Sequence, residues 1–254
     1  MRAVVATVGT THPLAFAGLP HALLVLAAEG VRPVCVVAGV SAQDAAHVLA
    51  RSDVDADTIA AQFAALRTAD VRAFHVGALL SADAVRAVAR GLADVSVPIV
   101  IDPVLAATGG DLLADGAARD ALRTELIPRA TLLTPNLDEA GALLGRPVAD
   151  LPAMREAGWA LHALGARAVL VKGGHLAGDA IDVLVDVSGV YELRGPRLPG
   201  TVRGSGDLLA AAAAAALARG LDLQAAVAHG RAQVRAALGD AVPFAGTHVR
   251  RLGP

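Results

Sequence analysis

The segment RGSGDLLAAAAAAALA, residues 203–218, joins a glycine turn to an alanine-rich helix. Gly204 and Gly206 flank Ser205, and together they let the backbone fold tightly so that successive N–H groups point at one place. The helix predicted over 207–218 adds the positive end of its dipole at the same place. We therefore expect an anion-binding turn with Asp207 beside it in the first helical turn. The same spacing also fits an ordinary glycine turn in which Asp207 only caps its helix.

Outward from this segment, short β-branched runs alternate with Ala/Leu/Arg stretches of helical period. Such alternation predicts an α/β fold in which βαβ units build a mainly parallel sheet with helices on both faces. Strands are expected at residues 3–8, 34–37, 74–76, 99–102, 132–134 and 168–172. Helices are expected at residues 81–92, 207–218 and 223–238, and at 14–29 with an interruption at residues 18–20. A hairpin near a sheet edge is expected at 181–191. No linker, repeat or charge block divides residues 1–254, so we expect one domain.

Composition excludes several classes of protein. Hydrophobic residues are 55% of the 254 and charged ones 18%, which is incompatible with intrinsic disorder. The most apolar run, residues 208–218, is much shorter than the roughly 20 residues of a membrane span. A net charge of −2 and 2% aromatic residues argue against a nucleic-acid partner. We expect a cytoplasmic chain without a targeting segment or membrane association, in which Cys35 is a buried, inert thiol.

Candidate functional residues follow the predicted strands, where parallel sheets bind their ligands. Asp102 ends one strand, and the segment LLTPNLDEA, residues 132–140, leads from another strand into a helix. Oxygen ligands from Asn136, Glu139 and Asp102 suit Mg²⁺, in part through water. The spacing of Asn136 and Glu139 also fits a helix capping box, so this segment alone does not decide between the two.

Lys172 is the only lysine in the chain and Asn136 the only asparagine. A genome rich in Arg and Ala codons would explain the bias. A lysine that persists under such bias nevertheless indicates a need for a compact ammonium charge, here one that could neutralise phosphate oxygens. Gly173 and Gly174 follow it and allow a ligand to approach the backbone. His175 is expected to be a loop residue.

Four segments in this order resemble the ribokinase-like fold and, more narrowly, the hydroxymethylpyrimidine/phosphomethylpyrimidine kinases of thiamin biosynthesis. They are DPV at 102–104 with GGD at 109–111, TPNLDE at 134–139, VKGGH at 171–175 and GSGD at 204–207. The resemblance covers residues 34–220 and implies a three-layer sandwich. It also implies ATP-dependent phosphoryl transfer to the hydroxymethyl group of 4-amino-5-hydroxymethyl-2-methylpyrimidine, to its monophosphate, or to both.

The resemblance also implies residue roles. Asp207 would be the catalytic base, and Lys172 would contact phosphate. The anion hole would comprise Gly204, Ser205 and Gly206. MgATP would be bound by Asn136, Glu139, Lys172, Gly173 and Gly174, with Asp102 and Glu139 at the metal. The acceptor would contact Gly9, Ala78 and Gln43, whose amide suits an aminopyrimidine edge. A homodimer is the assembly that the family suggests.

The first loop departs from the family pattern. Residues 9–22, GTTHPLAFAGLPHA, contain no Asp, whereas the family segment ends in an Asp near the substrate. We expect His12 and His21 to be surface residues, although either could supply a donor in place of that carboxylate. Pyridoxal or another hydroxymethyl heterocycle is therefore an alternative acceptor. A pyrimidine-binding regulatory pseudokinase is a second alternative. Asp207, found where many members have Cys but shared with sugar and pyridoxal kinases of the fold, favours an active enzyme.

Overall fold

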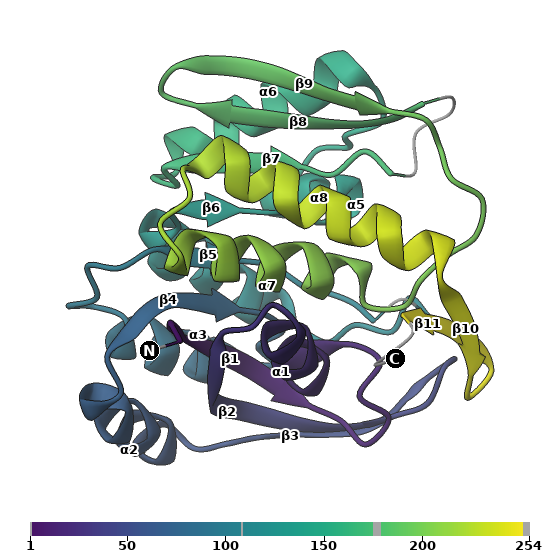
Figure 1. Ribbon diagram of the computed structural model, residues 1–254. Coiled ribbons are helices and arrows are strands. Elements are labelled where there is room, and N and C mark those ends of the chain that lie inside the picture. The colour runs from purple at the N-terminus through teal and green to yellow at the C-terminus, as the bar shows by residue number, and fades with distance from the viewer. Residues whose placement is uncertain (1, 108, 175–178, 251–254) are drawn as a thin grey trace.

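A nine-stranded sheet forms the centre of the molecule, in the order β3-β2-β1-β4-β5-β6-β7-β8-β9 (Figure 1). The structure is a computed structural model that describes residues 2–107, 109–174 and 179–250. The strands of the sheet are β1 (Val4–Thr11), β2 (Arg32–Gln43), β3 (Val48–Asp53), β4 (Val71–Val76), β5 (Ile99–Ile101), β6 (Leu132–Leu133), β7 (Ala168–Val171), β8 (Ala180–Asp186) and β9 (Gly189–Gly195). Strands β2, β1, β4, β5, β6 and β7 are parallel, whereas β3 at one edge and β8 and β9 at the other are antiparallel to their neighbours.

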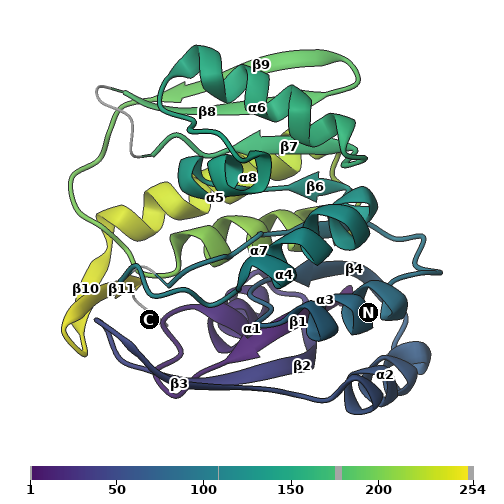
Figure 2. The ribbon, with the colours of Figure 1, turned by 180° about the vertical axis from the view of Figure 1, so that it is seen from behind.

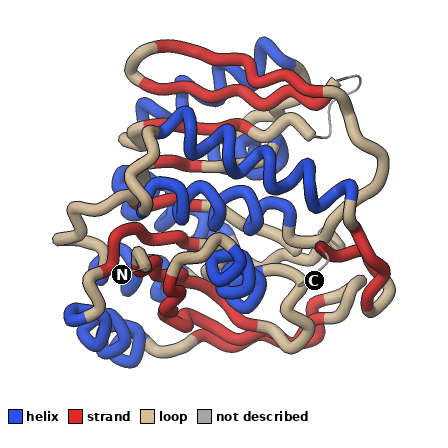
Figure 3. Tube along the Cα trace, in the orientation of Figure 1, coloured by secondary structure: helices blue, strands red, loops and turns tan. Residues whose placement is uncertain are grey.

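Helices cover both faces of this sheet, which confirms the predicted three-layer α/β architecture. One face carries α1 (Gly18–Ala28), α7 (Ser205–Ala218) and α8 (Leu223–Gly239). The other face carries α2 (Ala56–Ala65), α3 (Ala82–Gly91), α4 (Gly116–Ala121), α5 (Leu137–Leu144) and α6 (Leu151–Ala163), as seen from behind in Figure 2. Short helical turns are η1 (Leu66–Thr68), η2 (Leu122–Leu126) and η3 (Ile127–Arg129). A separate hairpin, β10 (Ala241–Phe244) and β11 (Thr247–Arg250), follows α8 (Figure 3).

The alanine-rich segment forms the buried helix α7. Every residue from Ala210 to Ala216 is fully buried, between the sheet and the flanking helices α1 and α8 (Figure 1). Small side chains let α8 approach closely, and Gly230 of α8 packs on the backbone of Leu209. In the described residues, no helix is both long enough and apolar enough to span a bilayer.

Substituting Gly230 by alanine tests this close contact. A Cβ atom at Gly230 would lie 2.7 Å from the carbonyl oxygen of Leu209, so the two helices must separate. Overpacking costs about 1–3 kcal/mol, and alanine returns up to about 1 kcal/mol of helix propensity. We expect Gly230→Ala to lower the free energy of unfolding by about 1–2 kcal/mol in urea. Gly239→Ala, where a Cβ atom meets nothing within 4 Å, is the control and should not be destabilised.

Two local expectations are wrong. The helix expected over 14–29 with a break at residues 18–20 instead begins at Gly18 and continues through Pro20, because positive φ angles at Ala15 (52°) and Gly18 (64°) keep the preceding residues out of it. Cys35 is half-buried rather than buried, because β3 pairs with β2 only from Gly39 onward and leaves the start of β2 at the sheet edge. The hairpin predicted near a sheet edge is confirmed as β8 and β9.

Candidate functional site

The first turn of α7 lies at the carboxyl ends of the parallel strands, on the right in Figure 1. Gly204 precedes the helix in a left-handed conformation, with φ of 73°, which accounts for the glycine. Asp207 is buried in the first turn and does not cap its own helix. Its Oδ2 instead accepts a 2.8 Å hydrogen bond from the backbone N–H of Gly18, the first residue of α1. The alternative in which Asp207 is an ordinary cap is therefore wrong.

Lys172 and Asp102 lie directly against this turn. Lys172 Nζ donates to Asp102 Oδ1 over 2.7 Å, and Thr134 Oγ1 donates to the same oxygen over 3.1 Å. A Cβ atom at Gly206 would lie 2.8 Å from Asp102 Oδ2 and 3.1 Å from Lys172 Nζ. Gly206 is therefore required so that the carboxylate and the ammonium can approach the start of α7.

Asn136 and Glu139 form a capping box at the start of α5. Asn136 Oδ1 accepts from the N–H of Glu139, and Glu139 Oε2 accepts from the N–H of Asn136, each over 2.8 Å. Asn136 also pairs with Lys172 in an isolated β-bridge, which brings α5 next to the lysine. The capping interpretation is thus confirmed. It leaves Glu139 buried at the site with Oε1 as the carboxylate oxygen outside the box.

The charges of the site act on one another. Burial, followed by repulsion from Asp102, raises the pKa of Asp207 to about 7. Burial likewise raises the pKa of Glu139 to about 7. Burial alone would lower the pKa of Lys172, but the attraction of Asp102 and Glu139 outweighs it, so the pKa of the ammonium is raised. The lysine is therefore charged at neutral pH.

The residues predicted to contact an acceptor lie at the ends of three adjacent strands. Gln43 ends β2, Gly9 lies near the end of β1, and Ala78 follows β4. A Cβ atom at Gly9 would lie 3.5 Å from the carbonyl oxygen of Ala78, which also accepts from Thr10 Oγ1 over 2.9 Å. Gln43 Oε1 is buried and has no hydrogen-bond partner.

The expectation of surface histidines in the first loop is wrong. His12 and His21 are only 6% and 4% exposed. The loop between them is apolar, and it folds onto the start of α7: the carbonyl oxygen of Phe16 and Nδ1 of His21 lie 2.4 Å and 2.7 Å from where Gly204 would carry a Cβ. The sequence does carry a signal for this burial: residues 14–19, LAFAGL, are apolar and lie between the two histidines.

A comparison of the sequence with known protein families identifies the family of this chain. The model of the family described as phosphomethylpyrimidine kinase matches residues 14–250. The chain belongs to this family. The hydroxymethylpyrimidine/phosphomethylpyrimidine kinase of Mycobacterium tuberculosis is 42% identical over 91% of the chain and 86% of its own length.

Solved structures similar to this family member include two named kinases. The ADP complex of Bacillus subtilis pyridoxal kinase superposes with a TM-score of 0.90 at 27% identity, over 99% of this chain and 98% of that one. Phosphomethylpyrimidine kinase from Clostridium difficile gives a TM-score of 0.82 at 26% identity, over 92% of this chain and 98% of that one. The fold is therefore the ribokinase-like fold that the motifs indicated.

Sequence reasoning missed two residues beside the family's lysine segment. Asp182 of β8 accepts from the N–H of Gly173 over 3.0 Å and from Nε of Arg231 in α8 over 2.8 Å. A Cβ atom at Gly173 would lie 2.1 Å from the carbonyl oxygen of Ile181, so packing alone requires this glycine. The amide of Gly173 is thus paired within the protein, whereas around Gly174 the space is open. His175 lies outside the described residues.

The carboxylates of the site fit a divalent cation. Asp102, Glu139 and Asp207 surround the single ammonium of Lys172, so negative charge is in excess when all are ionised. Across residues 2–107, 109–174 and 179–250, no three His, Cys, Asp or Glu side chains converge on one ion position. One or two carboxylates together with phosphate oxygens and water are the ligands that Mg²⁺ takes in phosphoryl-transfer sites.

The stability of an Asp207→Asn variant should reveal the raised pKa. The unfolded chain releases this proton near pH 4, whereas the folded protein retains it to about pH 7. The wild-type protein therefore loses stability relative to the variant as pH rises from about 4 to 7, and the difference is constant above that. We expect a change on the order of 2–4 kcal/mol in urea unfolding. A pH-independent difference would contradict the raised pKa.

Proposed function

We propose that the chain catalyses ATP-dependent phosphoryl transfer to 4-amino-5-hydroxymethyl-2-methylpyrimidine, to its monophosphate, or to both, in thiamin biosynthesis. The observation that carries the proposal is that Asp207 lies in the first helical turn directly after the glycine turn, while Gly206 of that turn lies against Lys172. A proton acceptor, backbone N–H groups and a cation are thereby gathered around one point. Membership of the phosphomethylpyrimidine kinase family supports the pyrimidine acceptor.

We propose that Asp207 accepts the proton of the attacking hydroxyl group. The backbone N–H groups of Gly204, Ser205 and Gly206 bind the phosphoryl oxygens as charge moves onto them. Lys172 contributes a fixed positive charge next to the turn, because Asp102 holds its ammonium at 2.7 Å. Positioning and charge stabilisation of this kind account for most catalysis of phosphoryl transfer.

On the nucleotide side, we propose that MgATP is bound by Asn136, Glu139, Lys172, Gly173 and Gly174. Asp102 and Glu139 hold the Mg²⁺ ion, directly or through water, and the excess carboxylate charge at the site supports this assignment. When bound, Mg²⁺ neutralises charge on the phosphate oxygens.

On the acceptor side, we propose that Gln43 binds the aminopyrimidine edge, with Gly9 and Ala78 beside the ring. The unpartnered, buried Oε1 of Gln43 supports this role, because a ring amino group could donate to it.

We also propose that the chain is one kinase domain that works in the cytoplasm as a homodimer. The continuous nine-stranded sheet supports the single domain. The edge strand β3 has an unpaired outer edge in the described residues and carries Leu49, which is 70% exposed; a second copy covering this edge would bury both.

Removing the Asp207 carboxylate should separate catalysis from nucleotide binding. Asp207→Ala removes the proton acceptor, and a general base contributes about 10²–10⁴-fold to rate. We expect kcat to fall by this factor, measured as ADP release with the pyrimidine alcohol, while the Kd for MgATP changes less than about threefold. Asp83→Ala, at an exposed position of α3, is the control and should keep the wild-type rate. Wild-type turnover in Asp207→Ala would eliminate this mechanism.

A screen of acceptors tests the substrate class. Rates of ADP release are compared for the pyrimidine alcohol, its monophosphate and pyridoxal. Preference for pyridoxal would favour the alternative acceptor. Pyridoxal is included because the fold is similar to that of Bacillus subtilis pyridoxal kinase. Binding of the pyrimidine in a calorimeter with no ADP formed at long incubation would instead indicate a regulatory pseudokinase.

A further inference from the structure

The acceptor side of the site contains a buried charge that the proposed mechanism does not use. Arg203 directly precedes the glycine turn and is only 9% exposed. Its Nη2 donates to the carbonyl oxygen of Ala45 over 3.0 Å, and its guanidinium lies 4.9 Å above the ring of Phe16. Its Nε is buried without a hydrogen-bond partner.

This arginine has no counter-ion in the described part of the chain. No carboxylate there lies within 4.0 Å of its guanidinium. The acidic group that acts on it most is Asp44, whose side chain accepts instead from the N–H groups of Ala46 and His47 on the exposed β2–β3 turn. An arginine remains charged even when buried, so in the described residues its positive charge is not neutralised by a carboxylate.

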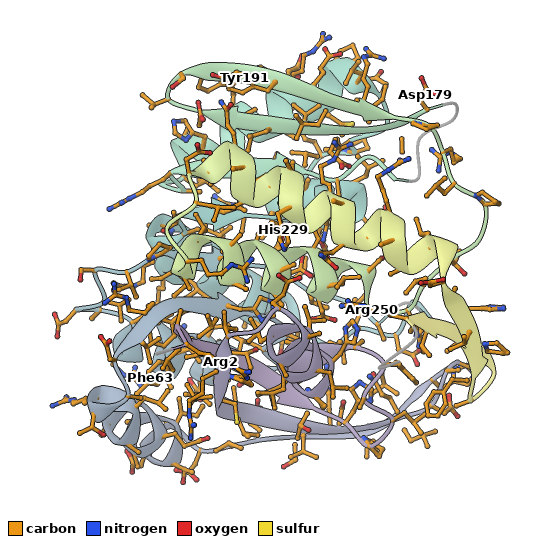
Figure 4. All side chains as sticks on the ribbon, in the orientation of Figure 1. Arg2, Phe63, Asp179, Tyr191, His229 and Arg250 are labelled. Carbon is orange, nitrogen blue, oxygen red and sulfur yellow. The ribbon has the colours of Figure 1, made fainter. Side chains whose placement is uncertain are left out.

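The titratable side chains around Arg203 on the first loop and the C-terminal hairpin are histidines and an arginine, none of which can neutralise it. Burial lowers the pKa of His21 to about 4 and also lowers the pKa of His12, so both rings are neutral at pH 7. Nδ1 of each ring is buried without a partner, and Nδ1 of His21 lies over Gly204. Arg250, the last residue of β11 and labelled in Figure 4, also acts electrostatically on His21 and has an unpartnered buried Nη1.

The two sides of Asp207 therefore differ in charge. On the side of Lys172, carboxylates are in excess, which suits MgATP. On the side of the first loop, Arg203 and Arg250 are in excess. Because Ala45 lies two residues after Gln43, Arg203 belongs to the acceptor side. An uncharged alcohol offers nothing to neutralise this side, whereas a phosphorylated acceptor does.

We propose that Arg203 binds the phosphate of a monophosphorylated acceptor and makes the monophosphate the preferred substrate over the free alcohol. This inference rests on the proposed function and narrows it. In the reaction, a phosphate oxygen of the acceptor forms a bond to the γ-phosphorus of ATP as the bond to the ADP oxygen breaks. The products are ADP and the pyrimidine diphosphate, and a proton on the attacking oxygen passes to Asp207. Arg203 is thus a specificity-determining residue.

The test compares two acceptors with wild-type protein and Arg203→Gln. We expect the wild-type kcat/KM to be higher for the monophosphate than for the alcohol. A charged hydrogen bond contributes about 1.5–3 kcal/mol, which corresponds to about a 10- to 150-fold loss. Arg203→Gln should lose this factor on the monophosphate, mainly through KM, and less than about threefold on the alcohol. Arg90→Gln, at an exposed position of α3, is the matched control and should resemble the wild type.

The Arg203→Lys variant distinguishes loss of phosphate binding from a purely structural effect of the substitution. It retains charge and a long apolar stem but loses the planar fork, so we expect an intermediate loss confined to the monophosphate. Equal losses on both acceptors would overturn the inference, since they would place Arg203 at the γ-phosphate or in the packing. Wild-type turnover of the alcohol without preference for the monophosphate would overturn it and leave the proposed function intact. Turnover of neither pyrimidine would contradict the proposed function itself.

Discussion

The hydrogen bond from the Gly18 amide to the Asp207 carboxylate holds together the parts of the site. It joins the first turn of α1 to the first turn of α7, although the two residues are 189 positions apart. Both helix N-termini direct positive dipole ends toward this buried carboxylate, which offsets part of its desolvation. The remaining cost appears as the raised pKa of Asp207. A group with this pKa can both accept and release a proton near neutral pH, as proton transfer requires.

The parallel strands and the turn at Gly204 could be predicted because their signals are local. β-branched runs identify strands, and a glycine pair before an alanine run identifies a tight turn at a helix start. The proximity of Lys172 to Asp102 followed from the rule that strand ends share one edge of the sheet. This proximity could be predicted from the positions of the two residues at strand ends, without knowing any side-chain contact.

The parts that sequence reasoning did not find depend on long-range packing. No local pattern shows that Asp182 would accept from the Gly173 amide, because the antiparallel pairing of β7 with β8 places the two residues side by side. The burial of His12 and His21 depends on a loop of irregular conformation with positive φ at Ala15. The half-buried state of Cys35 depends on how far β3 extends along β2. Each of these is a property of neighbours that are distant in the chain.

The run of seven alanines in α7, residues 210–216, has a consequence for how firmly the site is held. Alanine has no rotamers to lose, so ordering this helix carries almost no side-chain entropy penalty. Along the alanine run, few side chains interlock with neighbouring elements. The position of the helix along its own axis is therefore set at its ends, by Gly204 and the first loop at one end and by Gly220 at the other. A shift of α7 along its axis would move every N–H group around the anion site together, so whatever fixes the two ends of the helix also fixes the geometry of the catalytic turn.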